Sequence, residues 1–438
     1  MSSPGKNFDR FLQIVDRSTP VEVRGRVKEV VGLLLRAWVP EVWIGELCLI
    51  YSGRSTVPLR AEVVGFQEGD VLLMPLGDLT HVGPSSEVVP TGRSLTIQVG
   101  ESLLGRVLNG LGEPMDGGGP LENTEEFDVD REPPDPMRRQ RVLRPLATGV
   151  RAIDGLLTCG EGQRVGLFAA AGGGKSTLMG MIARNTEADV NVIVLVGERG
   201  REVRDFLEES LGEKGLARSV VVCSTSDQPS LIRLKAAYVG TAIAEYFRDQ
   251  GRRVMFMMDS VTRFARAKRE IGLACGEPPA RAGYTPSVFT ELPRLLERSG
   301  NSDKGSITAF YTVLVAGDDM NEPVADEVRS ILDGHVVLSR SLAAQGHYPA
   351  IDVLQSVSRV MTAVAEKEHL EHARHMRKLL AAYERERDLI LLGAYERGSD
   401  ALVDEAIEKV GNLNGFLRQS VEEETDMETT LGQLSAVL

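Results

Sequence analysis

A run of small residues near the middle of the chain has the composition of a loop that holds phosphate groups. The run AAAGGGKST occupies residues 169–177 and approaches the pattern G-x-x-x-x-G-K-[ST], with Ala169 at the first glycine position. In that pattern backbone N–H groups surround phosphate oxygens, the lysine reaches the β- and γ-phosphates, and the hydroxyl residue holds Mg²⁺. The alternative is a tight strand-to-helix turn without a ligand. We predict an ATP site formed by Ala170, Ala171, Gly172, Gly173, Gly174, Lys175, Ser176 and Thr177.

Two carboxylates follow apolar runs that read as buried strands. Asp259 ends RRVMFMMD, and Glu198 comes after VIVLVG. Because parallel strands present their carboxyl ends at one edge of a sheet, both side chains are expected beside the loop. Asp259 is predicted to hold the metal with Ser176, through water, and Glu198 to orient or deprotonate the attacking water. The alternatives are a helix cap at Asp259 and an ion pair between Glu198 and Arg199 or Arg201.

Hydrolysis also requires a positive charge that stabilises the transition state. Arg199, Arg340 and Arg359 are candidates. Their spacing along the chain does not decide between them.

The elements that must position these residues are short apolar runs separated by helical stretches. The runs are RVGLF, NVIVLVG, SVVVCS, RVMFMMD and SITAFYTVLV. Apolar runs without alternation are typical of strands buried on both faces of a parallel sheet, and the helices between them complete a βαβ series. The fold class is therefore α/β, with a phosphate-binding loop in its core.

The rest of the chain divides by composition. Short β-branched segments with glycine turns predict a small β-barrel over residues 19–95, and a stretch rich in Gly, Pro and acids predicts a connector over 96–145. The nucleotide-binding domain is expected over 146–361 and a helical domain over 362–438. Residues 1–18 have helical periodicity and form either a helix packed on this protein or an arm that docks on a partner.

Charge and cysteine usage exclude several functional classes. The chain has 438 residues and a formal net charge of -13, which argues against a broad nucleic-acid groove. It contains no run of about 20 apolar residues that would span a membrane, and no secretory signal is evident at its start. Of the four widely spaced cysteines, three stand in apolar or small-residue contexts, which predicts buried free thiols and a reducing cytoplasm.

In its motifs the chain resembles a known family, the ATPases of type III protein secretion. The flagellar export ATPase is their near relative, and the catalytic subunit of rotary ATP synthase is a more distant one. The resemblance extends from about residue 20 to the C-terminus. The motifs that carry it are GLFAAAGGGKST, VGERGREVRDF, MMDSVTRFARAKREIGLACGEPPARAGYTPSVF, VLVAGDDMNEPVADEVRSILDGH and HYPAIDVLQSVSRVM.

The resemblance implies a RecA-like nucleotide domain in a homohexameric ring, with ATP bound between subunits. Glu198 becomes the catalytic carboxylate, and Lys175 and Ser176 bind phosphate and Mg²⁺. Arg359, in QSVSRVM, becomes an arginine finger offered to the nucleotide of a neighbouring subunit, with a structural ion pair as the alternative. Because one chain carries both Glu198 and Arg359, identical subunits would complete one another's sites.

The resemblance also assigns residues around the base. Tyr348, in GHYPAID, matches the aromatic residue that packs on adenine, and core packing is its alternative role. Tyr383 is a second candidate wall of the base pocket. At Gly173 the family usually has valine, so the loop here is expected to be more flexible.

The function implied is an export motor of the virulence type, cytoplasmic and peripheral at the inner-membrane export apparatus. Its implied partners are a stator at residues 1–18, a central stalk protein at the loop Gly276–Pro286, and secretion chaperones with their substrates, but no nucleic acid. The loop has a plain surface role as its alternative. The flagellar export ATPase, an RNA ring helicase, an ATP synthase subunit and a nucleotide-binding scaffold are the competing interpretations.

Overall fold

The computed structural model describes residues 23–438 except 54, 171 and 316–319. The predicted arm at residues 1–18 and the loop residue Ala171 therefore lie outside the described residues. The contacts within the chain divide it into two units, Met1–Leu95 and Thr96–Leu438.

In its described part, the first unit is a closed barrel of six strands in the order β1-β2-β5-β4-β3-β6. Inward and outward side chains alternate along its strands, as the period of two residues requires. Leu35 and Ala37 on β2 are fully buried, and Val63, Leu73 and Val88 meet them in the barrel core. The strands are β1 (Gly25–Val31), β2 (Leu34–Trp38), β3 (Leu47–Tyr51), β4 (Leu59–Gln67), β5 (Asp70–Pro75) and β6 (Glu87–Pro90).

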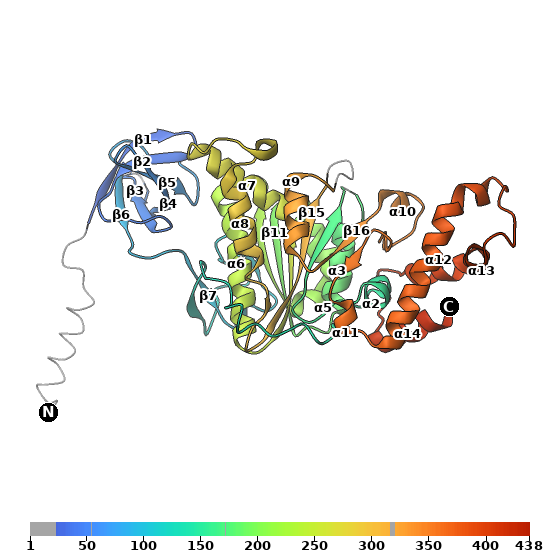
Figure 1. Cartoon of the computed structure of the whole chain (residues 1–438). Coiled ribbons are helices and arrows are strands. Elements are labelled where there is room, and N and C mark those ends of the chain that lie inside the picture. Colours follow the sequence, from blue (N-terminus) through green and yellow to red (C-terminus); the bar gives the residue numbers. More distant parts are fainter. Residues whose placement is uncertain (1–22, 54, 171, 316–319) are drawn as a thin grey trace, which may run out of the picture. The chain divides into compact units, whose positions relative to one another are not determined.

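The second unit contains a largely parallel sheet, which appears at the centre of Figure 1. Among the described residues its order is β17-β16-β10-β15-β13-β11-β12-β8, and β14 pairs with β15. The strands from β16 to β8 run parallel, and only β14 and β17 are antiparallel to their neighbours. Their bounds are β8 (Val107–Asn109), β10 (Arg164–Ala169), β11 (Val190–Glu198), β12 (Ser219–Thr225), β13 (Arg253–Asp259), β14 (Gly300–Asn301), β15 (Ser306–Leu314), β16 (Gly334–Leu338) and β17 (Val357–Ser358).

Two groups of helices cover this sheet. The helices α6, α7 and α9 pack on one another, and α3, α5 and the π-helix η2 form the other group. Every residue of β11 is buried, which explains why its sequence is apolar without alternation. The helices are α2 (Arg151–Leu156), α3 (Lys175–Asn185), α4 (Gly200–Asp205), η2 (Phe206–Leu211), α5 (Gly212–Ala217), α6 (Ser230–Asp249), α7 (Val261–Ala274), η3 (Arg281–Gly283), α8 (Pro286–Leu296), α9 (Pro323–Ile331) and α10 (Arg340–Ala344).

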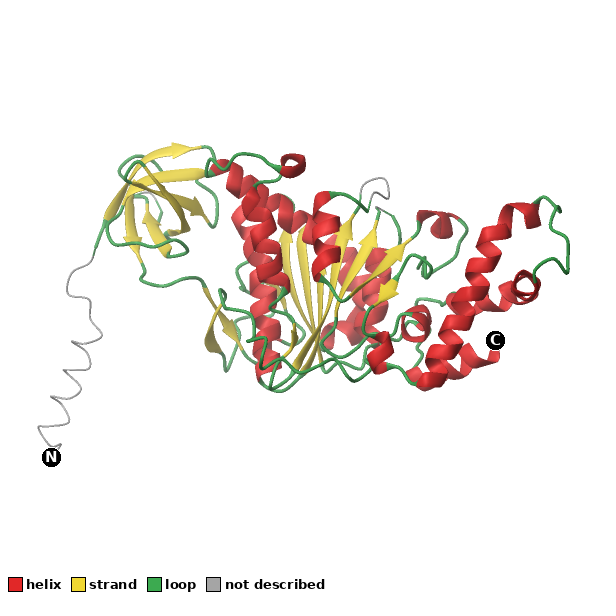
Figure 2. Cartoon of the chain, in the orientation of Figure 1, coloured by secondary structure: helices red, strands yellow, loops and turns green. Residues whose placement is uncertain are grey.

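The end of the chain is helical, as Figure 2 shows in red. It comprises α11 (Met361–Val364), α12 (Lys367–Leu391), α13 (Ala401–Leu417) and α14 (Met427–Ala436). The buried ring of His369 places Nε2 2.8 Å from the carbonyl oxygen of Gly155 on α2, and Gln419 accepts a hydrogen bond from the Arg151 amide at 2.9 Å. These contacts connect the C-terminal helices to α2.

The predicted barrel, parallel sheet and helical C-terminal region are therefore all present. The segment predicted as a connector contains more structure than its composition indicated. β7 (Thr96–Val99) pairs with β9 (Glu125–Asp128), and β8 joins the core sheet. The fully buried Arg298 also donates to the Val129 carbonyl oxygen at 2.9 Å. The segment of β7 was expected to be a strand, whereas β8 and β9 were not, because such short strands among Gly and Pro show no periodic pattern.

Cys48, Cys159 and Cys223 are buried free thiols, and Cys275 is half-buried and also free. This confirms the prediction for three of the four cysteines. Within the residues that the structure describes, no helix combines the length and the apolarity needed to cross a bilayer.

Candidate nucleotide site

The glycine-rich loop joins a strand to a helix, as the sequence predicted. β10 ends at Ala169 and α3 begins at Lys175. Gly172 and Gly174 have φ angles of 84° and 80°, in the left-handed region that favours glycine. Ala169 instead lies buried in β10, opposite Leu314 and Leu338, so an alanine methyl group fits where the motif has glycine. The departure at the first motif position therefore leaves the loop intact.

Gly173 is not held in the left-handed region, so glycine is not required there by the backbone. A Cβ at this position would lie 3.4 Å from the Ala170 carbonyl oxygen and 3.6 Å from Cβ of Leu338, which are ordinary contacts. We expect Gly173→Ala to tighten ATP binding about two- to fivefold, because it lowers the entropy lost when the loop is ordered. Titration with a fluorescent ATP analogue measures this. Gly174→Ala is the control and should weaken binding, since alanine is strained at a φ of 80°; equal effects of the two variants would contradict the argument.

Lys175, Asp259 and Glu198 meet at the carboxyl ends of the parallel strands. Lys175 Nζ lies 2.6 Å from Asp259 Oδ1 and 3.8 Å from Glu198 Oε1. Asp259 ends β13 and Glu198 ends β11, which are neighbours in the sheet. Both carboxylates are buried, so their attraction for the ammonium group is little screened by solvent. The predicted phosphate-binding lysine, metal carboxylate and catalytic carboxylate thus form one cluster.

Glu198 lies in an environment that raises the pKa of its carboxyl group. Burial raises its pKa to about 7, and a hydrogen bond with Glu202 and the charge of Asp259 act in the same direction. Lys175 and Arg263 oppose the shift. A carboxylate with a pKa near neutrality suits general-base catalysis.

Arg263 is a site residue that sequence reasoning missed. Its Nη1 lies 2.6 Å from Glu198 Oε1 and donates to the Gly197 carbonyl oxygen at 2.7 Å. Arg263 lies in the first turn of α7, four residues after Asp259. The available signal was an arginine in the first turn of the helix that follows Asp259, because that turn lies at the same sheet edge.

Asp259 has a second partner in the neighbouring strand. The fully buried hydroxyl of Thr312 on β15 donates to Asp259 Oδ1 at 2.9 Å. The Asp259 carboxylate and the exposed Ser176 hydroxyl are hard oxygen donors, the kind that Mg²⁺ prefers, so these residues fit a magnesium ion bound with nucleotide phosphates.

Thr312→Val tests the positioning of Asp259, since it keeps the volume and removes only the hydroxyl. We expect the Mg²⁺ concentration for half-maximal turnover to rise about tenfold, because a hydrogen bond to a charged group is lost. Binding of a fluorescent ATP analogue without Mg²⁺ should stay unchanged. Thr312→Ser should restore the Mg²⁺ dependence, and failure of this rescue would show that packing rather than the hydroxyl matters.

The two tyrosines predicted around the base lie in different places. The half-exposed ring of Tyr348 approaches the loop, with Cδ1 and Cε1 3.7 Å from the position of a Cβ on Gly174. Tyr383 lies on α12 and lines a cavity whose described wall includes no residue of the loop. The structure therefore brings Tyr348, but not Tyr383, to the nucleotide site.

Arg359 is far from the nucleotide loop of its own chain. Its backbone N–H donates to the Asp333 carbonyl oxygen at 3.0 Å, and Asp333 pairs with Arg164 at the start of β10. The loop begins at the other end of that strand, on the order of 17 Å away at the usual rise per residue. The exposed Arg359 side chain donates to the Arg329 carbonyl oxygen at 3.4 Å. Arg359 cannot complete the site of its own subunit.

The other two candidate arginines also lie on the surface. Arg199 is 79% exposed and pairs with Glu202 at 3.3 Å, and Arg340 is exposed at the start of α10. Of the basic side chains near the cluster, Lys175 and Arg263 have the direct contacts with its carboxylates.

Fold and site together define an ATPase with a RecA-like core. Residues 149–358 match the nucleotide-binding domain of the ATP synthase alpha/beta family, and residues 27–92 match the beta-barrel domain of that family. Residues 365–436 match the C-terminal domain of the T3SS EscN ATPase.

Individual relatives match this chain along nearly its whole length. The flagellum-specific ATP synthase of Bacillus subtilis (strain 168) is 56% identical over 98% of this chain and 98% of its own length. The type 3 secretion system ATPase of Xanthomonas euvesicatoria is 56% identical over 94% of this chain and 93% of its own. The structure of the assembled ATPase EscN from enteropathogenic E. coli has a TM-score of 0.88 at 46% identity and covers 94% of this chain and 99% of that one.

The chain belongs to the family of type III secretion ATPases and their flagellum-specific relatives, within the ATP synthase alpha/beta family. It is an ATPase of this family. The match of its last 70 residues or so to the EscN C-terminal domain favours the export ATPases over the catalytic subunit of a rotary ATP synthase.

Proposed function

We propose that this chain is the ATP-hydrolysing motor of a type III protein export apparatus. Lys175 and the loop N–H groups would hold the β- and γ-phosphates, and Glu198 would orient and deprotonate the attacking water. Ser176 and Asp259 would hold Mg²⁺, which neutralises charge on the phosphates. The observation that carries the proposal is the cluster of Lys175, Asp259 and Glu198 at one edge of the sheet.

The motor would act as a homohexameric ring. Arg359 lies near the amino ends of the parallel strands, whereas the loop lies at their carboxyl ends. It would therefore serve the nucleotide of the next subunit as an arginine finger. Tyr348 would pack on the adenine beside Gly174. Such head-to-tail contacts repeat around a closed ring of identical chains.

Conformational changes of the ring during ATP turnover would release chaperones and unfold exported proteins. The ring would act at the cytoplasmic face of the inner membrane. A solved structure shows EscN in complex with its central stalk EscO, and we propose a comparable stalk here. The loop Gly276–Pro286 would contact it; in this loop Arg281 pairs with Asp326 at 3.2 Å. Residues 1–18 would bind a stator, and no nucleic acid is expected to bind.

We favour the virulence type, on the motif FARAKREIGLACGEPPARAG. The flagellar export ATPase is the second candidate, because the flagellum-specific relative of Bacillus subtilis shares as much identity as the relative from Xanthomonas. Export of flagellar subunits by cells that lack their own flagellar ATPase and carry this chain would decide for the second candidate.

ATP turnover per subunit, measured against protein concentration with Mg²⁺, tests the proposed motor. A steep rise, in step with ring formation by light scattering, is expected because each site needs two subunits. Constant turnover from a protein that light scattering shows to be monomeric would overturn the ring and the role of Arg359. If a folded protein binds ATP but does not turn it over, with or without a stalk protein, the proposal that this chain is a motor would be overturned.

A further inference from the structure

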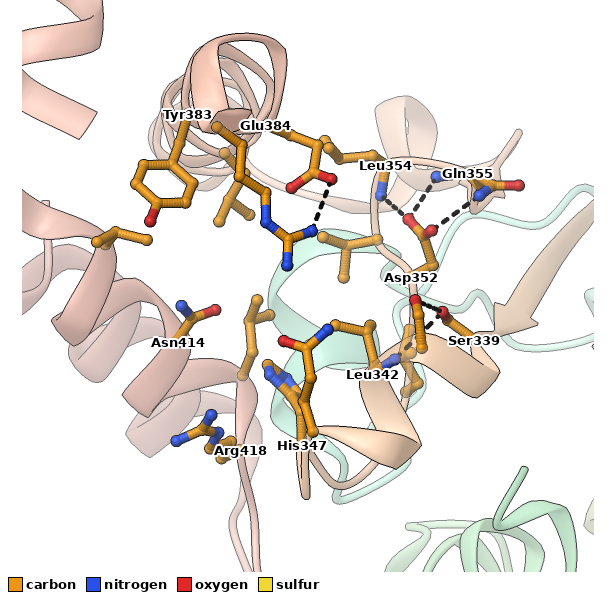
Figure 3. A pocket seen from close by; sticks show the side chains of 18 of the residues that line it. Ser339, Leu342, His347, Asp352, Leu354, Gln355, Tyr383, Glu384, Asn414 and Arg418 are labelled. Carbon is orange, nitrogen blue, oxygen red and sulfur yellow. Dashed lines mark hydrogen bonds and ion pairs between the residues drawn. The ribbon is translucent and has the colours of Figure 1, made fainter. Parts of the chain in front are cut away.

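A cavity separate from the phosphate loop lies between the segment that follows β16 and the C-terminal helices (Figure 3). Its volume is about 530 Å³, within the range of small-molecule sites. Side chains of α10, of residues 351–355, of α12 and of α13 surround it. Leucine and valine side chains line part of it together with Tyr383, and polar and charged side chains line the rest.

His347 is the most unusual of these polar groups. Its side chain is buried, with the residue only 4% exposed, and within the described chain Nε2 has no hydrogen-bond partner. Burial lowers the pKa of His347, and the charge of Arg418 acts in the same direction, so the ring is neutral at physiological pH. Buried polar atoms are nearly always paired in native proteins. His347 therefore carries an unsatisfied ring nitrogen beside the cavity, and a polar group of a ligand would supply the missing partner.

Three of the four charged groups in the wall already have partners. Asp352 accepts hydrogen bonds from the N–H groups of Leu354 and Gln355, and Glu384 accepts one from Arg387 at 3.2 Å. Both carboxylates are thus already engaged. The exposed Arg418, in contrast, forms no ion pair among the residues that the structure describes, and Figure 3 shows it at the same side of the cavity as His347.

We propose that this cavity is a second ligand site, which takes a small molecule with an aromatic body and one carboxylate or sulfonate group. The anionic group pairs with Arg418 and accepts a hydrogen bond from His347 Nε2. The aromatic body packs on the leucine side chains and on Tyr383. Nothing in the hydrolytic cluster of Lys175 and Glu198 takes part.

The site is connected to the nucleotide loop through Tyr348. His347 directly precedes Tyr348, and the N–H of Gln419, the residue after Arg418, donates to the Tyr348 carbonyl oxygen at 3.0 Å. A ligand that holds His347 and Arg418 together therefore holds Tyr348 beside Gly174 and slows nucleotide exchange. This consequence, unlike the site itself, depends on the proposed role of Tyr348 at the adenine.

The test uses naphthalene-1-sulfonate as the probe and the full chain labelled at histidine. The chain has six histidines, so the ring signal of His347 is assigned by its loss in His347→Gln. Saturable movement of that signal is expected, and it should persist in the presence of an ATP analogue. An unmoved signal at millimolar probe, or displacement of the probe by the nucleotide, would overturn a separate site.

Variants locate the probe without touching the hydrolytic cluster. Asn414→Trp fills the cavity and Arg418→Gln removes its charge; each should weaken probe binding at least about tenfold. Arg397→Gln removes an exposed arginine elsewhere in the C-terminal region and is the matched control. Equal affinities of the Arg418 and Arg397 variants would overturn the assignment. Circular dichroism shows whether each variant is folded, and unfolded variants are replaced by Leu342→Phe, which also fills the cavity.

Discussion

Glu198→Gln should lower ATP turnover about 10³-fold while ATP still binds, because glutamine keeps the shape of glutamate but cannot accept the proton of the attacking water. Turnover and the affinity for a fluorescent ATP analogue are the two measurements. Glu208→Gln is the matched control, since Glu208 lies on η2, further along the same segment, and pairs with Arg204 at the surface. Unchanged turnover in Glu198→Gln would remove Glu198 from the mechanism and favour a scaffold that binds nucleotide without hydrolysing it.

The position of Glu198 also predicts the pH dependence of this reaction. Its pKa is raised to about 7, chiefly by burial, so the carboxyl holds its proton to a higher pH than a glutamate in water. A general base works only when deprotonated, so kcat/KM should rise with pH through about 7 and then level off. Arg263→Met removes a positive charge that favours the ionised form of Glu198. The rising part of the pH profile should therefore move to higher pH. A profile that is flat from about pH 5.5 to pH 8 would contradict the assignment.

The second large effect concerns Arg359. Arg359→Ala should lower turnover about 10³-fold or more, since an arginine finger stabilises charge in the transition state. Its distance from the loop of its own chain means that nucleotide affinity of the monomer should stay unchanged. Arg329→Ala is a control, because Arg329 lies on the adjoining helix α9 and supplies only its carbonyl oxygen to Arg359. A monomer that turns over ATP at full rate, or an active Arg359→Ala ring, would exclude the trans role.

Mixed rings separate action in trans from structural damage. A Glu198→Gln subunit still offers Arg359, and an Arg359→Ala subunit still has Glu198. Mixing the two inactive variants in equal amounts should restore about a quarter of the sites, if subunits assemble at random into a closed ring. No recovery from rings of normal size would mean that both residues act within one subunit or that Arg359 is structural.

Much of the fold was readable in the sequence. The runs that form β10, β11, β12, β13 and β15 were predicted because unbroken apolar stretches are too short for helices and too apolar for exposed strands. The barrel was predicted from short β-branched segments separated by glycine turns. The strands β8 and β9 were missed, because three or four residues among Gly and Pro carry no periodic signal.

The sequence by itself determined where the glycine-rich loop lies, between a strand and a helix, and predicted the roles of its residues. Lys175, Ser176 and the glycines are neighbours within one short segment, so the roles expected of them follow from the local pattern and require no distant contact. The carboxylates Glu198 and Asp259 were predicted for a related reason: a polar residue at the end of a buried strand lies at the carboxyl edge of a parallel sheet.

Only the tertiary structure decided which distant side chains meet. The order of the strands brings Thr312 to Asp259 and Arg263 to Glu198, and it places Arg359 at the end of the sheet away from the loop. It also separates Tyr383 from Tyr348 and forms the cavity beside His347. Such contacts depend on pairing between segments far apart in the chain, and that pairing follows from the packing of the whole core rather than from any local pattern.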